Sequence, residues 1–378
     1  MASATTVKSS TPSRLLALDW LRGVAVLVMV ECHVFNAVIA PRYREAGWFV
    51  FLNWLNGFVA PAFLLVSGGV IGINLQKRWA DVLTFGKAWS RLWRRIGQIF
   101  IVAYLLHLPT PFLWQFFGPR GPHLVALWTK MDILQCVAGS LSLILLLVPL
   151  TRNARLHRLV CAALGIIAVA SVSLVDGWAE GSTLPRPLLS YFWPTGVGLF
   201  PLVPWAAFPL LGVWLGPAIF SATKTSQQSV RATAAGIAFL LVARFAPSNG
   251  WYDGVFVFGK LGWVLVALAA CCWFGEPVRG TRWLLEFGQL SLWSYTVHLI
   301  LVYGSGLSFG MDALRTYRIP PFTEGFPPWA ALICLILVLS VTAWVVRWRA
   351  KSLQREMKWK ADHTRIGAGE PDVASVDG

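Results

Sequence analysis

The stretch "LALDWLRGVAVLVMVECHVFNAVIA", residues 16–40, decides the fold class. Its apolar run is long enough to cross about 30 Å of hydrocarbon as one α-helix. It nevertheless carries four ionisable side chains, Asp19, Arg22, Glu31 and His33. A charged side chain in the middle of such a helix costs roughly 2.5 to 3.5 kcal/mol on insertion scales. Each of the four groups therefore needs a partner or a function.

Similar apolar segments recur along the chain of 378 residues, of which 56% are hydrophobic and 13% charged. This composition is typical of membrane proteins and excludes an ordinary soluble domain. We therefore expect an all-α polytopic membrane protein with about ten transmembrane helices. The expected spans cover residues 15–39, 49–74, 96–117, 131–150, 158–176, 199–219, 233–248, 255–275, 284–305 and 327–347.

The formal net charge is +15, and the basic residues concentrate in alternate connections between the expected spans. Because Lys and Arg mark the cytoplasmic loops of membrane proteins, this pattern and the even number of spans place both termini in the cytoplasm. The same pattern accounts for the charge without a nucleic-acid partner, and no RNA-binding motif accompanies it. We divide the chain into a polar segment (1–13), a transmembrane domain (14–350) and a tail (351–378) that is first basic and then disordered.

Helix geometry groups the polar residues of the first span. Arg22 and His33 are eleven residues apart, which is three turns plus ~20° of rotation, so they share one face about 16 Å apart along the axis. Asp19 precedes Arg22 by three residues and is placed to neutralise it. Glu31 lies ~160° away from His33 and belongs to another face. Its partner is open, with Lys260 as one candidate.

This face suits a long ligand with an anionic head at the cytoplasmic end and a reactive group deeper in the membrane. An acyl-CoA has that shape, with phosphates at one end and a thioester at the other. The forked donors of Arg22 suit phosphates. The imidazole of His33 can accept a proton near neutral pH. The alternative stays open that Arg22 only reaches the headgroups and His33 only bonds across helices.

Two later spans carry further candidates. His298 follows Ser294 by one turn and Ser291 by two, on a similar face. It either faces His33 and orients an acceptor or makes an ordinary interhelical hydrogen bond. Asp132 and Gln135 are one turn apart at the start of the fourth span. They touch an acceptor or support His33, although Asp132 is equally suited to cap the helix.

Arg91, Arg94 and Arg95 recur at one-turn spacing beside the third span and form the second expected contact for CoA phosphates. Cytoplasmic topology and anionic lipid are the alternative explanation, and it is favoured for any single one of these residues. His107 precedes two prolines, so a structural role is favoured there, because polar side chains satisfy backbone groups at such breaks. No cluster of His, Cys and carboxylate has metal-ligand spacing, and no metal is expected.

A family resemblance adds to these inferences. "LDWLRGVAVLVMVECHV" resembles the first helix of the membrane acyltransferase superfamily that contains the acyltransferase-3 proteins and the heparan-alpha-glucosaminide N-acetyltransferase family. Arg22 and His33 match the Arg-x10-His pattern of the first branch, whereas the "LDxxRG" start is typical of the second. Four further segments resemble the second branch in order: "APAFLLVSGGVIGI" (60–73), "DILQCVAG" (132–139), "LFPLVPWAAFPLLGVWLG" (199–216) and "FGQLSLWSYTVHLILVYG" (287–304).

The resemblance implies a bacterial acyltransferase of the inner (plasma) membrane that uses acetyl-CoA or another acyl-CoA as co-substrate. Two departures weaken the match to a heparan substrate. The loop after the first helix, "NAVIAPRYREAGWFVF", has no histidine, and Gln135-Cys136 replaces the usual Gln-Arg. The role of His33 as general base is therefore carried over from the acyltransferase-3 pattern.

The expected function is transfer of an acyl group, most simply acetyl, from cytoplasmic acyl-CoA to a hydroxyl or amine of an extracytoplasmic sugar or glycan. His33 and His298 are the expected catalytic residues, and Arg22 with Asp19 anchors the donor. The alternative is a transporter or exporter of an anionic or lipid-linked solute along the same face. The lipid bilayer is the expected surrounding, and a homodimer stays open.

Overall fold

The computed structural model describes residues 13–193, 199–222, 224–246, 253–274, 281–305, 308–312 and 324–367. These residues are almost entirely helical, with one small hairpin of β1 (Gly304–Ser305) and β2 (Ser308–Phe309). The helices of the first half are α1 (Ser13–Val38), η1 (Pro41–Tyr43), α2 (Gly47–Asn56), α3 (Val59–Lys77), α4 (Trp79–Leu83), α5 (Lys87–Leu106), η2 (Leu113–Phe117), α6 (Gly121–Trp128), α7 (Ile133–Thr151), α8 (Ala154–Ala170) and α9 (Val172–Glu180). Those of the second half are α10 (Arg186–Leu189), α11 (Leu202–Trp205), α12 (Ala207–Phe220), α13 (Thr225–Phe245), α14 (Gly254–Cys271), α15 (Arg282–Gln289), α16 (Ser291–Tyr303) and α18 (Pro328–Gly367).

Several helices are long and apolar enough to cross a membrane, which confirms the expected all-helical membrane class. Within the described ranges there are six such helices, or seven when the bent pair α8–α9 counts as one span. They are Leu16–Val38, Gly47–Lys77, Ile133–Thr151, Leu202–Phe220, Gly254–Cys271 and Pro328–Met357. Each coincides with one of the ten segments expected from the sequence.

The other expected spans fall on helices that are more charged, less apolar or shorter. The span expected over 96–117 corresponds to α5, which begins with a basic turn and ends at Leu106. It ends there because Pro109 and Pro111 follow, and the residue before a proline disfavours the helical conformation. The segment at 233–248 overlaps α13, which begins with the polar run "TSQQS" and ends at Phe245, and its last two residues lie outside the described ranges. That at 284–305 is divided into α15 and α16, of 8 and 13 residues.

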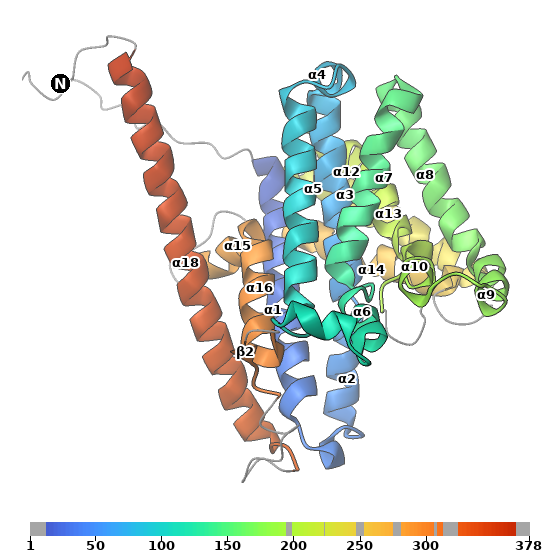
Figure 1. Ribbon diagram of the computed structural model, residues 1–378. Coiled ribbons are helices and arrows are strands. Elements are labelled where there is room, and N and C mark those ends of the chain that lie inside the picture. The colour runs from blue at the N-terminus through green and yellow to red at the C-terminus, as the bar shows by residue number, and fades with distance from the viewer. Residues whose placement is uncertain are drawn as a thin grey trace, which may run out of the picture.

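Figure 1 shows that α1 begins, and α18 ends, at the same end of the helix bundle. The long α18 leans against α1, α15 and α16. The boundary expected at residue 350 lies inside α18, which continues as one helix to Gly367. Most of the expected polar segment at the N-terminus (1–12) and the expected disordered end (368–378) lie outside the described residues.

Small residues allow α1 to approach its neighbours closely. At Gly23 of α1, an added Cβ would overlap the carbonyl oxygen of Leu284, and at Gly288 of α15 it would overlap the carbonyl of Asp19. Helices in lipid gain most of their association energy from such close packing of small residues. The contact fixes the start of α1 against α15, and α1 then continues alongside α16. This placement decides which residues meet His33.

Candidate active site

A cavity of about 1190 Å³ joins the polar residues of α1 to several other helices. It is lined mainly by side chains of α1, α3, α5, α7 and α16, with single residues of α2, α4 and α6. Arg22 and His33, which helix geometry places on one face, both line it. We call the part around Arg22, Arg91, Arg94 and Arg95 the arginine end. The part around His33, His298, His107 and Asp132 is the histidine end.

At the histidine end, α1 and α16 bring two histidines into contact. His33 Nδ1 lies 2.9 Å from His298 Nε2, and the two rings are stacked with centroids 5.2 Å apart. His298 is fully buried, whereas His33 is half-buried and reaches the cavity. Nδ1 of His298 lies 2.7 Å from the carbonyl oxygen of Ser294, one turn earlier.

These contacts fix the tautomers of neutral rings. A carbonyl only accepts, so Nδ1–H of His298 must donate to Ser294 and its Nε2 must be an acceptor. Nδ1–H of His33 then donates to His298, which leaves the lone pair of the His33 ring on Nε2. Among the described residues Nε2 of His33 has no hydrogen-bond partner. The pair thus presents one basic nitrogen, oriented by a second ring, as general-base catalysis requires.

Two tyrosines of α16 frame the histidine pair. The Tyr303 ring lies edge-on to His33 with centroids 5.6 Å apart, and its hydroxyl donates to the His33 carbonyl at 3.4 Å. Tyr295 is buried against His298, also edge-on at 5.6 Å. Both tyrosines line the cavity, and the sequence had not indicated either of them. Tyr295 precedes His298 by one turn on a similar face, which is a usable signal, whereas Tyr303 lies five residues after His298 on another face and spacing does not indicate it.

A second pair at the histidine end joins His107, which follows the end of α5, to Asp132, which precedes α7. His107 Nε2 lies 2.9 Å from Oδ2 of Asp132, and both residues line the cavity. His107 Nδ1 lies 2.9 Å from the carbonyl oxygen of Ala103, so the expected backbone role is present as well. Asp132 caps α7 by accepting from the Ile133 N–H at 2.7 Å. His107 is therefore both a structural residue and a part of the site that sequence reasoning missed.

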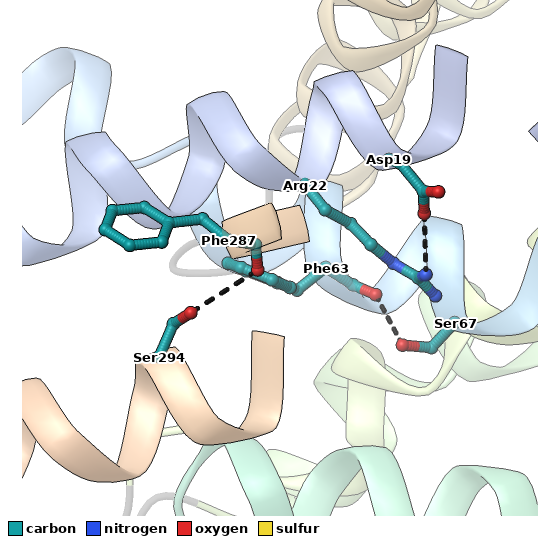
Figure 2. Close-up of polar contacts among 6 residues, drawn as sticks. All are labelled: Asp19, Arg22, Phe63, Ser67, Phe287 and Ser294. Carbon is teal, nitrogen blue, oxygen red and sulfur yellow. Dashed lines mark hydrogen bonds and ion pairs between the residues drawn. The ribbon is translucent and has the colours of Figure 1, made fainter. Parts of the chain in front are cut away.

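At the arginine end, Arg22 pairs with Asp19 across one turn of α1 at 3.7 Å, as the spacing predicts. Figure 2 shows the Arg22 guanidinium pointing from α1 toward the turn of α3 that carries Ser67, while Asp19 holds its other side. Ser67 itself donates to the Phe63 carbonyl at 2.7 Å and lines the cavity.

Three exposed arginines of α5 lie on the wall of this end of the cavity. Arg91, Arg94 and Arg95 all line it, and Arg95 is close enough to Arg22 for their charges to repel. None of the three has an ion pair or hydrogen bond within the part of the chain that the structure describes. Several cations that face one space without counter-ions favour an anionic ligand there.

The other residues singled out from the sequence, Ser291, Gln135 and Glu31, do not all reach the cavity. Ser291 lines the cavity, whereas Gln135 is fully buried outside the lining, and neither atom of its amide has a partner among the described residues. Oε1 of Glu31 is buried without a hydrogen-bond partner among the described residues. Its suggested partner Lys260 instead lies over the Phe58 ring, with its ammonium 3.8 Å from the ring centroid.

Comparison with known proteins gives one family match. The family model described as "Heparan-alpha-glucosaminide N-acetyltransferase, catalytic" matches residues 14–246. No curated protein matches the chain. The matched residues include Arg22, His33, His107 and Asp132, and they end before α16 with its His298.

Proposed function

The chain belongs to the heparan-alpha-glucosaminide N-acetyltransferase catalytic family, and we propose that it carries an acetyl group across the membrane to an outer acceptor. It is a multi-pass membrane acetyltransferase that uses acetyl-CoA. In the proposal the donor enters from the cytoplasm, and the acceptor is an amine or hydroxyl of an extracytoplasmic sugar or glycan.

The observation that carries this proposal is the single cavity with the arginine end and the histidine end on its walls. Arg22, with Asp19 as its partner, and Arg91, Arg94 and Arg95 offer donors for the phosphates of CoA. The extended arm of CoA then directs the thioester along α1 toward His33. Holding both substrates in one enclosed space supplies much of the rate enhancement, because it replaces a bimolecular encounter.

His33 acts as the general base. The acceptor amine or hydroxyl attacks the thioester carbonyl carbon while Nε2 of His33 removes its proton. The carbon–sulfur bond breaks, and the proton passes from His33 to the departing CoA sulfur, so the ring returns to its neutral state. His298 keeps the reactive nitrogen facing the cavity through its hydrogen bond to His33 Nδ1. Ser291 and Asp132 line the same cavity and are the proposed acceptor contacts, while Gln135 is buried one turn from Asp132.

The proposed topology has ten crossings with both termini in the cytoplasm of a bacterial cell, in its inner membrane. The alternating basic residues support this orientation. So does the common end at which α1 begins and α18 ends, since an even number of crossings returns the chain to its first side. The arginine end then faces cytoplasmic acetyl-CoA and the histidine end faces the outer leaflet.

The test is acetyl transfer by the purified full chain in lipid nanodiscs. Labelled acetyl-CoA is supplied with a panel of amino sugars and glycans, and the product is identified by mass. We expect transfer by the wild-type protein and by His123→Gln, an exposed histidine of α6 that does not line the cavity. In His33→Gln, turnover falls by about 10²- to 10⁴-fold, the usual contribution of a general base. Wild-type turnover by His33→Gln would exclude this mechanism.

A further inference from the structure

Tyr295 of α16 is a buried side chain with an unused hydrogen-bond donor. Only 6% of the residue is exposed, and its ring lies edge-on to His298 with the centroids 5.6 Å apart. Tyr295 lines the cavity, yet its hydroxyl has no hydrogen-bond partner within the described ranges. A buried polar group that lacks a protein partner is satisfied by water or by a ligand. The hydroxyl of Tyr295 is therefore available to a molecule in the cavity.

The packing of α15 and α16 on α1 places Tyr295 on the side of the histidine pair that faces the arginine end. The two helices follow α1 in the same direction, since Gly288 packs against Asp19 and His298 meets His33. Tyr295 precedes His298 by three residues, which is about 4.5 Å along the axis. An acyl-CoA whose phosphates bind at the arginine end therefore brings its thioester past Tyr295 to reach His33.

The transfer step proposed above creates a negative charge that His33 does not stabilise. When the acceptor attacks the thioester, the electron pair of the carbon–oxygen double bond moves onto the oxygen. Nε2 of His33 meanwhile takes the proton of the acceptor. Acyl-transfer enzymes place hydrogen-bond donors at this oxygen, and such donors are worth more in a site that excludes water than in solution. The histidine end therefore needs a donor besides its two histidines.

We propose that Tyr295 is a catalytic residue whose hydroxyl donates a hydrogen bond to the thioester carbonyl oxygen as that oxygen becomes negative. The inference rests on the function proposed above. Tyr295 keeps its own proton throughout. The carbon–sulfur bond breaks as the carbon–oxygen double bond forms again, and the acceptor proton passes from His33 to the CoA sulfur. The edge contact with His298 positions the Tyr295 ring relative to the base, because His298 also bonds to His33.

Two other side chains of this end are alternative donors. The Tyr303 hydroxyl already donates to the His33 carbonyl at 3.4 Å. Lys130 lines the cavity, but in the part of the chain that the structure describes it has no hydrogen bond to His33 or His298. Tyr295 differs from both because its ring packs directly on the histidine pair and its donor is free.

The experiment measures kcat and KM of the full chain in nanodiscs. Tyr295→Phe keeps the ring and removes the hydroxyl. We expect kcat to fall by about 10- to 100-fold, the value of one hydrogen bond to a charged group. KM for either substrate changes little, because the bond strengthens only in the transition state. Tyr43→Phe, in η1 outside the cavity, is the matched control and keeps wild-type kcat. Lys130→Gln lowers kcat less than Tyr295→Phe does.

Fluorinated tyrosines at position 295 separate donor strength from packing. Fluorine makes the phenol a stronger donor and changes the size of the ring very little. We expect kcat to rise with phenol acidity, measured at a pH where the phenol stays protonated. This series also tests the proposal if Tyr295→Phe does not fold.

Wild-type kcat in Tyr295→Phe would overturn the proposal, and so would a kcat that does not depend on fluorination. A 10- to 100-fold loss in Lys130→Gln beside wild-type kcat in Tyr295→Phe would assign the donor to Lys130 instead. The result at His33 separates the two levels of inference. Wild-type turnover in His33→Gln removes the proposed function, whereas lost turnover there with an unaffected Tyr295→Phe removes this inference alone.

Discussion

The two ends of the cavity hold their charges in opposite ways. At the histidine end, His33, His298, His107 and Asp132 make hydrogen bonds to one another or to the backbone. At the arginine end, Arg22 has Asp19, whereas Arg91, Arg94 and Arg95 have no partner among the described residues. A network with satisfied hydrogen bonds keeps one geometry. Cations without counter-ions attract an anionic ligand. We therefore assign the chemical step to the histidine end and donor binding to the arginine end.

The largest effect is expected when the second ring of the histidine end is removed. We expect His298→Phe to lower kcat by about 100-fold with donor affinity nearly unchanged, because His33 loses the acceptor that fixes its tautomer. Steady-state kcat and KM check this expectation. Restoration of part of the activity by His298→Gln, which keeps an acceptor, would identify the hydrogen bond rather than the ring volume as the cause.

A substitution at the arginine end tests donor binding. We expect Arg22→Ala to weaken acetyl-CoA binding by about 10- to 100-fold, the value of one or two charge-assisted hydrogen bonds. Its kcat at saturating donor changes much less. Arg155→Ala, an exposed arginine of α8 outside the cavity, is the control and keeps wild-type affinity. Calorimetric titration with a non-reactive acetyl-CoA analogue measures both, and intact affinity in Arg22→Ala would refute the anchor role.

The smallest expected effects belong to the exposed arginines of α5. Single substitutions of Arg91, Arg94 or Arg95 by Gln should raise KM for acetyl-CoA by about 3-fold each, since exposed charges are screened by solvent. The increase should shrink at higher salt for all three. A salt-independent effect at any one of them would instead indicate a buried, direct contact.

The sequence predicts those parts of the site that depend on a single helix. The Asp19–Arg22 pair and the shared face of Arg22 and His33 follow from the helical repeat, and the structure contains both. The helical membrane fold likewise follows from composition. Helix ends were less predictable, because the prolines after α5 end it before the apolar run does.

Contacts between helices are the part that spacing does not determine. His33 and His298 are separated by 265 residues, and their hydrogen bond depends on how α1 packs on α16. His107 was assigned a structural role because it precedes prolines, yet the same break brings it to Asp132. His107 follows α5 and Asp132 precedes α7, with η2 and α6 between them, so sequence spacing alone did not indicate this contact. Gln135, one turn from Asp132, turned into the protein interior, and no local pattern distinguishes the two.

The most direct test of the division between the two ends is a paired measurement on one variant. His33→Gln is purified in nanodiscs, and its affinity for acetyl-CoA and its single-turnover rate with a saturating acceptor are compared with those of the wild-type protein. We predict wild-type donor affinity together with a rate lower by about 10²-fold or more. A variant that loses donor affinity in proportion to its rate, or that keeps the wild-type rate, would contradict the account.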